Sequence, residues 1–375
     1  MSEYAEKYGL REENFQIQPD RDRSVFYGKE NLASSIVNNL KRKLLVGRPV
    51  KAVLYGDIGV GKTQLLRYIS FQLANEVYSV YIKCPAYHRR TSYVAGFHSV
   101  VFSELGSDFI FELLGKAIGG LAAQPLGIPL RKRELERVIR NGWTGDRNAL
   151  RKFLSGAVLT SSEMRSIGAI RQQLNEDEAV EVLNMISELT EKVTGKKLLL
   201  LVDEFENTNV LRGDPMTMFT EAIREIVEES NRVNVLFAAT VRSIEENRIL
   251  NNSSIRSRIG HLNYHEIGEY TEEEIRSLIG SVIRYKRSPD FDVGRAISKL
   301  SAATKERLDI QWFPFTVEAI DELVEGLKLL RDDGIIPLLR PRETLELMDR
   351  SLSIAVEMKS DVIDSEAVRS AIGPR

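Results

Sequence analysis

The sequence predicts an α/β protein with a doubly wound parallel sheet, followed by an all-helical C-terminal region. Short apolar runs alternate with helical patterns between about residues 50 and 267, which is typical of βαβ units. One run, 198–202, is apolar at every position, as expected for a strand buried on both faces. From about residue 270 only helical periodicity remains. These observations define the fold class before any motif is considered.

The elements follow from local patterns. Five apolar runs are expected to form strands at 50–55, 79–84, 198–202, 233–240 and 262–267. Helices are expected at 64–73, 217–229, 272–285, 316–331, 342–358 and 365–372. Capping-box patterns at Asn175 with Glu178 and at Thr271 with Glu274 begin two helices, and Gly195 follows the end of the first.

The chain is therefore expected to have three parts. Residues 1–48 form a charged N-terminal lead-in. Residues 49–268 form the α/β core, with a mostly helical insertion at about 85–195. Residues 269–375 form a helical region that is too small for a second catalytic domain and is interpreted as a lid.

Composition excludes several classes of protein. The net charge of −2 over 375 residues argues against a generally basic surface for nucleic acids. The one cysteine, Cys84, excludes an internal disulfide, and the four histidines show no metal-ligand spacing. The N-terminus is polar and no apolar run approaches membrane-spanning length, so we expect a soluble, cytoplasmic protein with no membrane partner.

A phosphate-binding loop, G-x-x-x-x-G-K-[ST], lies between the first expected strand and the helix at 64–73. Its residues are Gly56, Asp57, Ile58, Gly59, Val60, Gly61, Lys62 and Thr63. Its glycines let successive backbone N–H groups point at an anion, and the helix N-terminus adds partial positive charge. Lys62 is expected to bridge the β- and γ-phosphates of ATP, and the Thr63 hydroxyl to bind Mg²⁺.

Two carboxylates follow the most apolar strand. Asp203 and Glu204 come directly after 198–202, at the strand end where ligands of open α/β sheets gather. Asp203 is expected to hold Mg²⁺ through water, and Glu204 to polarise the attacking water. The sequence therefore predicts an ATP hydrolase with ATP and Mg²⁺ as its ligands.

This order of motifs resembles the AAA+ ATPases, and within them the initiator branch, the origin-recognition ATPases that load replicative helicases. The resemblance spans roughly residues 24 to 372, and it is carried by the segments 26–30, 235–240, 255–259, 270–275 and 340–345. It implies that Tyr27 and Gly28 pack on adenine and that Thr240 senses the γ-phosphate. Gln64, directly after the loop, is also expected among the nucleotide-binding residues. Arg342 is expected to contact the γ-phosphate from the lid; the alternative is a simple surface charge.

The resemblance also implies self-association. The segment 255–259 is similar to the one that presents an arginine finger to a neighbouring subunit, and Arg258 is favoured over Arg256 for this role. The alternative is that both arginines are solvated surface charges.

Two departures from the initiators are expected to matter. Lys83 stands where initiators carry an asparagine that restrains the catalytic glutamate, which leaves that restraint in question. No winged-helix domain is expected after the lid, so duplex binding through such a domain is not carried over.

Segments 153–156, 174–179 and 201–206 are similar to ATP-binding proteins of bacterial phage-exclusion systems, which favours a DNA-related role.

The segment 131–171 holds ten basic and four acidic residues, a local charge of +6. Arg133, Arg137 and Arg140 are expected on one helical face near Trp143, a surface suited to a phosphate backbone or simply to solvent. At 93–97, aromatic residues are interpreted as core packing rather than as a pore loop.

The predicted function is an oligomeric AAA+ ATPase that couples ATP binding and hydrolysis to assembly on DNA or on a DNA-bound partner. The alternative is a nucleotide-switched signalling or scaffold ATPase without nucleic-acid contact. A protein unfoldase is the least favoured alternative because the pore-loop pattern is poor.

Overall fold

The computed structural model describes residues 7–86, 92–118, 127–228 and 233–373. The chain forms two compact units. One contains residues 36–57 and 69–266, and the other contains residues 1–35, 58–68 and 267–375. The boundary crosses the phosphate-binding loop, whose first two residues belong to the first unit and whose remaining residues belong to the second.

The first unit is built on a five-stranded parallel sheet, in agreement with the predicted fold class. Its order is β2 (Val77–Lys83), β3 (Lys197–Asp203), β4 (Asn234–Thr240), β1 (Lys51–Gly56) and β5 (Tyr264–Glu266). All four neighbouring pairs are parallel, so the carboxyl ends of the strands share one edge. At this edge, Lys83 pairs with Asp203 in register, and Gly56 pairs with Thr240. The last strand is shorter than expected because a 3₁₀ turn, His261–Asn263, precedes it.

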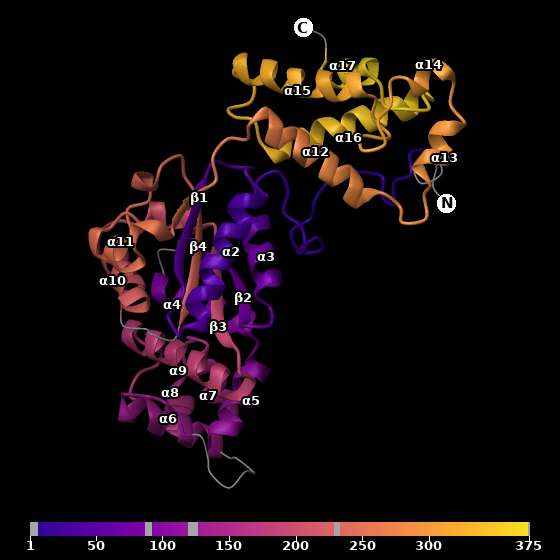
Figure 1. The fold of residues 1–375 in the computed structure, drawn as a ribbon. Helices are drawn as coiled ribbons and strands as arrows, with labels where there is room; N and C mark the ends of the chain where they lie inside the picture. The colour runs from indigo at the N-terminus through magenta and orange to yellow at the C-terminus, as the bar shows by residue number, and fades with distance from the viewer. Residues whose placement is uncertain (1–6, 87–91, 119–126, 229–232, 374–375) are drawn as a thin grey trace. The chain divides into compact units, whose positions relative to one another are not determined.

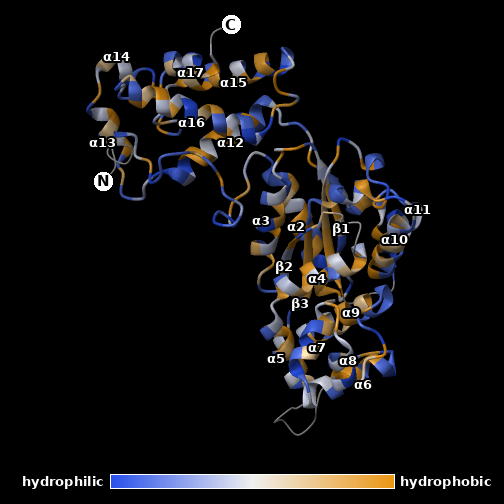
Figure 2. Ribbon diagram, turned by 180° about the vertical axis from the view of Figure 1, so that it is seen from behind, coloured by the Kyte–Doolittle hydropathy of each residue, from blue (hydrophilic) through white to orange (hydrophobic). Residues whose placement is uncertain are grey.

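Buried strands and a helical layer form the core of this unit. Every residue of β3 after Lys197 is buried, as the uninterrupted apolar run predicts. Helix α4 (Tyr93–Leu105) contacts β2, α9 (Glu176–Thr194) contacts β3, and α10 (Gly213–Glu228) packs on both helices (Figure 1). Figure 2 shows the hydrophobic colour concentrated on these strands and on the inner sides of the helices.

The insertion is mostly helical, as expected. Besides α4 and α9 it contains α5 (Ser107–Ile118), α6 (Arg133–Thr144), α7 (Arg147–Leu154) and α8 (Ser161–Ile167). The predicted capping box of α9 is present, because Glu178 N donates to Asn175 Oδ1 at 2.8 Å and Asn175 N donates to Glu178 Oε2 at 2.9 Å. Gly195 ends the helix in the left-handed conformation, at φ +72°.

The second unit is helical apart from its loops. It contains the first residues of α2 (Glu30–Leu45) and of α3 (Lys62–Gln72), together with α12 (Glu272–Lys286), α13 (Val293–Ser298), α14 (Ala302–Lys305), α15 (Val317–Asp332), α16 (Pro341–Glu357) and α17 (Ser365–Ile372). The capping box predicted at Thr271 and Glu274 is present, and Pro341 lies in the first turn of α16. The two short helices α13 and α14 were not predicted.

The N-terminal segment belongs to this helical unit. Tyr8, Leu10 and Phe15 are buried in its hydrophobic core. Phe15 N donates to Asp349 Oδ1 at 2.6 Å, and Leu10 forms an antiparallel bridge with Arg287. Although the segment is rich in charged residues, these three apolar side chains hold it against the helical unit. Within the described ranges, no helix is long and apolar enough to cross a membrane.

Candidate nucleotide site

The phosphate-binding loop follows β1 and leads into α3, as its sequence requires. Gly59 and Gly61 adopt φ values of +82° and +99°, which other residues rarely adopt. A Cβ atom at Gly59 would lie 3.1 Å from Arg342 Cβ, and one at Gly61 would lie 3.3 Å from the Phe26 ring. Helix α3 begins at Lys62, a buried side chain. The glycines thus permit both the turn and the close packing around it, which suits a loop that presents backbone N–H groups to phosphates.

The segment predicted to pack on adenine lies in the same unit as most of the loop. Gln64 Nε2 donates to the carbonyl oxygens of Asp22 and Val25, at 2.7 and 2.6 Å, and so ties the stretch just before this segment to the start of α3. Gly28 has φ +85°, and a Cβ atom there would lie 2.6 Å from the Tyr270 ring. The Tyr27 ring lies 6.2 Å from that of Tyr285, and burial raises the pKa of Tyr27 to about 12. Tyr27 is therefore a neutral phenol at ordinary pH.

Arg342 lies in the first turn of α16, and its Cβ atom approaches Gly59. Its side chain is exposed. The preceding arginine, Arg340, is buried and donates from Nη1 to the carbonyl oxygen of Ile58 at 2.5 Å. Two arginines of the C-terminal helices therefore lie beside the loop within one compact unit.

In the sheet unit, Asp203 ends β3 and is 4% exposed. Its Oδ2 atom accepts a hydrogen bond of 2.7 Å from the Tyr81 hydroxyl. One strand, β4, separates β3 from β1, so the end of β3 lies roughly 10 Å from the start of the loop at Gly56, by two strand spacings.

Glu204 forms an ion pair with Lys83 from the neighbouring strand end. Lys83 Nζ lies 2.9 Å from Glu204 Oε1, and both side chains are partly exposed, at 64% and 43%. Glu204 has φ +56° and ψ +35°, an uncommon conformation for a residue other than glycine. Lys83 therefore contacts the predicted catalytic carboxylate directly.

Thr240 ends β4 at the same edge of the sheet. Its backbone N–H donates to Glu206 Oε2 at 2.8 Å. Glu206 lies two residues after Glu204, on the 3₁₀ helix Phe205–Val210. A single short segment after β3 thus supplies one carboxylate to Lys83 and another to the end of β4.

The two candidate finger arginines differ in their surroundings. Arg256 is 29% exposed, donates to Asn251 Oδ1 at 2.8 Å and lies over the Tyr264 ring at 5.7 Å. Arg258 is 54% exposed and pairs with Glu228 at 2.5 Å. Both lie on α11 (Ser253–Ile259). Arg256 therefore has the contacts of a structural residue, whereas Arg258 lies on the surface with one acidic partner.

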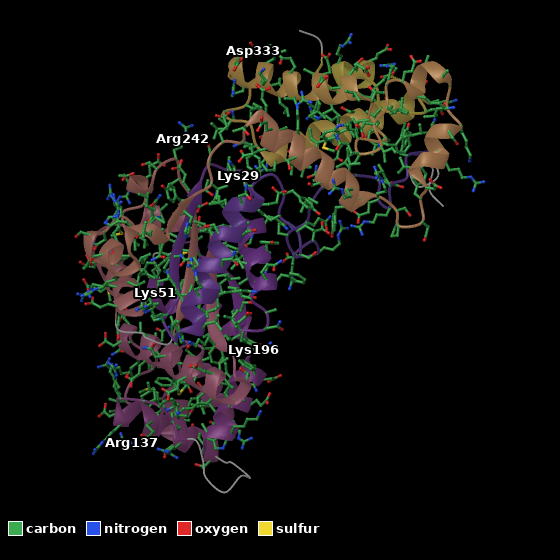
Figure 3. The ribbon with its side chains drawn as sticks, viewed as in Figure 1. Lys29, Lys51, Arg137, Lys196, Arg242 and Asp333 are labelled. Atoms are coloured by element: carbon green, nitrogen blue, oxygen red, sulfur yellow. The ribbon has the colours of Figure 1, made fainter. Side chains whose placement is uncertain are left out.

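The predicted arginine face is present on α6. Arg133, Arg137 and Arg140 are exposed, while the opposite face is buried; Figure 3 labels Arg137 at the outer side of the insertion. Arg140 pairs with Glu136 at 2.8 Å. Trp143 packs on Phe111, and the Arg147 guanidinium lies over the Trp143 ring at 4.2 Å. The aromatic residues at 93–97 lie on α4, where Tyr93 and Phe97 are buried against Phe219, as their interpretation as core residues predicts.

Sequence reasoning did not identify Tyr81, Glu206 or the loop contact of Arg340. Tyr81 resembles any aromatic residue of a strand, and only the β2–β3 register brings it beside Asp203. Glu206 had a weak signal, because it is a third acidic residue, just after the pair at the strand end. The described ranges contain no cluster of three His, Cys, Asp or Glu side chains that could hold a metal ion.

The sheet order β2-β3-β4-β1-β5, with the loop after β1, the acidic pair after β3 and the helical C-terminal unit, defines the AAA+ ATPase fold. The structure of Drosophila ORC bound to DNA aligns with 93% of this chain and 61% of its own, at 11% identity and a TM-score of 0.50. The Aeropyrum pernix ORC1 protein in complex with DNA aligns over 94% of this chain and 66% of its own, at 14% identity and a TM-score of 0.48. The Thermotoga maritima RuvB Holliday junction branch migration motor aligns over 95% of this chain and 72% of its own, at 14% identity and a TM-score of 0.44. The chain thus spans less than two thirds of both ORC proteins.

Residues 133–305 match the family model of the BREX system ATP-binding protein BrxC/D. The match covers the later helices of the insertion, β3, β4, β5 and the first helices of the C-terminal unit. It includes the segment for which the sequence indicated a resemblance to phage-exclusion ATP-binding proteins, and that resemblance is confirmed. No curated protein matches the chain.

Proposed function

We propose that this protein is an oligomeric ATPase that couples ATP binding and hydrolysis to assembly on DNA or on a DNA-bound partner. The observation that carries the proposal is the shared edge of the sheet. The phosphate-binding loop leaves this edge after β1, and Asp203 and Glu204 lie at the end of β3, with β4 between the two strands. A glycine loop alone supports binding, whereas an acidic pair at this spacing supports hydrolysis.

Each residue has a separate task in this proposal. The backbone N–H groups of the loop and Lys62 hold the phosphates, while Tyr27 and Gly28 lie on the adenine side. Thr63 and Asp203 would hold Mg²⁺, which would supply positive charge beside the phosphates. Glu204 accepts the proton of the attacking water once its carboxylate is released from Lys83. Thr240 and Arg342 contact the γ-phosphate.

We infer that hydrolysis requires a second subunit. Arg258 is the more exposed of the two arginines on α11, and it adds positive charge where the transition state spreads negative charge. In the single chain Arg258 pairs with Glu228. On assembly, this ion pair would be exchanged for contact with the negatively charged phosphate of the neighbouring subunit's nucleotide. Arg256, held by Asn251 and Tyr264, keeps α11 in place.

The proposed coupling to DNA is supported by the exposed positive charge of α6 and by the descriptions of the structures that this chain resembles. The matched ORC and RuvB structures are described as a DNA complex or a Holliday-junction motor, and the arginines of α6 are exposed. Several basic residues of the segment 131–171 are nevertheless paired internally: Arg140 with Glu136, Arg151 with Asp108 and Lys152 with Glu163. This pairing favours the alternative, a nucleotide-switched scaffold or signalling ATPase whose basic face meets only solvent.

Steady-state ATPase assays of three chains test the proposed chemistry. Asp203→Ala should weaken binding of Mg²⁺–ATP, because a metal-holding carboxylate is lost. Glu204→Gln should bind ATP normally and lose turnover by two orders of magnitude or more, about the contribution of a general base. Equal turnover in wild type and Glu204→Gln would remove Glu204 from this role. Stimulation of wild-type turnover by duplex DNA at low salt separates the DNA-coupled ATPase from the scaffold alternative.

A further inference from the structure

Arg340 contacts the phosphate-binding loop directly. Its Nη1 donates to the carbonyl oxygen of Ile58 at 2.5 Å. Its Nε and Nη2 donate to the two carboxylate oxygens of Glu343, at 2.7 and 2.6 Å. The side chains of Arg340 and Glu343 are 7% and 15% exposed. A bidentate pair with so little exposure holds the guanidinium in one orientation, with one edge toward the loop.

This contact lies within one compact unit, because residues 58–68 cluster with residues 267–375. Gly59, the residue after the contacted carbonyl, leaves room for it. A Cβ atom at Gly59 would lie 3.3 Å from the Cδ and Nε atoms of Arg340. On the same stretch of loop, the Tyr270 hydroxyl lies 3.5 Å from the carbonyl oxygen of Val60. Side chains of the C-terminal helices and of the chain entering them thus contact two alternate carbonyls of the loop.

The chemical consequence follows from the geometry of such loops. When backbone N–H groups turn inward toward an anion, the carbonyl groups of the same peptides turn outward. A donor fixed on an outward carbonyl therefore fixes the direction of the peptide that carries it. Arg340 fixes the peptide between Ile58 and Gly59 in this way, before any phosphate is present.

We propose that Arg340 is a positioning residue for nucleotide binding, and that Glu343 orients it. This inference rests on the proposed binding of ATP by the loop. Arg340 acts on the loop rather than on a phosphate, so it supports the binding of ADP and ATP equally. Arg342, whose exposed side chain begins beside Gly59, is the residue with the proposed γ-phosphate contact. The two arginines on either side of Pro341 therefore have different nucleotide dependences.

Calorimetric titration of the full chain with ADP and with the slowly hydrolysed analogue ATPγS separates these roles. Arg340→Gln should weaken the affinity for both nucleotides by the same factor, about tenfold or more, as expected for a lost charge-assisted hydrogen bond. Glu343→Gln should weaken both by a smaller common factor. Arg342→Gln should weaken the affinity for ATPγS while leaving the affinity for ADP nearly unchanged. Arg369→Gln is the matched control, because it breaks an exposed pair with Glu322 in the same unit.

Three outcomes would overturn the inference: unchanged affinities in Arg340→Gln, a loss confined to ATPγS, or a fall in the number of binding sites per chain at unchanged affinity. The last outcome would mean that Arg340 serves folding alone. If Arg340→Gln does not fold, Glu343→Gln and Arg340→Lys decide the question by the same equal-factor criterion. If the wild-type chain binds neither nucleotide, and Lys62→Ala behaves identically, the proposed function itself fails. That result is distinct from every outcome for Arg340.

Discussion

Lys83 Nζ lies 2.9 Å from Glu204 Oε1, and the two residues come from the ends of neighbouring strands, β2 and β3. The pair is half-exposed, so it contributes little to folding, about 1 kcal/mol or less. Its importance is chemical. An ammonium group held on a carboxylate fixes where the carboxylate points, and it occupies an oxygen atom that would otherwise face the attacking water.

We therefore predict that Lys83→Ala raises basal ATP turnover severalfold while leaving the thermal midpoint almost unchanged. Freed from its partner, the Glu204 carboxylate can turn toward the attacking water without a competing charge. Lys83→Arg, which retains the ion pair, is the control and should keep basal turnover low. Basal turnover that is the same in all three chains would show that the pair has no influence on hydrolysis.

The α/β core was predictable because its signals are local. The apolar run 198–202 became β3, and both capping boxes appear where their residue spacing predicts them. The ends of short elements were less predictable. Leu262 is apolar and was assigned to the last strand, yet it lies in a 3₁₀ turn and is 89% exposed.

The phosphate loop and the acidic pair could be identified because each is a contiguous string of letters. Contacts between distant segments had no such signature. Arg340 and Ile58 are 282 positions apart in the chain. The Thr240–Glu206 hydrogen bond uses the backbone N–H of Thr240, which cannot be predicted from the type of residue. Likewise, the charge count of 131–171 could not reveal that Arg140 pairs with Glu136.

Arg258 and Glu228 provide a test of assembly. If Arg258 completes a neighbouring subunit's site, turnover per subunit should rise with protein concentration, and Arg258→Ala should lower it by about a thousandfold, as for other arginine fingers. Mixing Arg258→Ala with Glu204→Gln should restore part of the activity, because some interfaces then join an intact arginine to an intact glutamate. Arg256→Ala should instead lower thermal stability. Turnover independent of concentration, with no recovery on mixing, would refute a shared site.

Lys51 gives the fold a pH dependence of known sign. Its ammonium is buried at the start of β1 and donates to the carbonyl oxygens of Ile226 and Val227, at 3.1 and 2.5 Å, in the last turn of α10. Burial lowers the pKa of Lys51 from about 10.5 to about 8. Between these values the unfolded chain binds more protons than the folded chain, so stability rises with pH across this window.

Relative to Lys51→Met, the wild-type chain should therefore gain stability between pH 8 and pH 10, by about 3 kcal/mol at most. The comparison removes the contribution of every other titrating group, because both chains share them. Thermal midpoints at pH 7.5, 9 and 10 measure the effect. A constant difference between the two chains across this range would mean that Lys51 keeps its ordinary pKa.

The arginine face of α6 decides between the DNA-coupled ATPase and the scaffold alternative. Changing Arg133, Arg137 and Arg140 together to Ala should weaken DNA binding and reduce the dependence of log K on log salt by two to three units, because each phosphate contact releases about one counterion. The lower value applies if Glu136 already neutralises Arg140. Basal ATPase activity should be unchanged, since α6 lies outside the proposed site, and the exposure of all three side chains predicts normal folding.

A triple variant of exposed arginines on the C-terminal helices, Arg295, Arg350 and Arg369, removes the same charge and should leave the salt slope unchanged. Equal slopes in wild type and the α6 variant would leave this face to solvent and favour the scaffold ATPase.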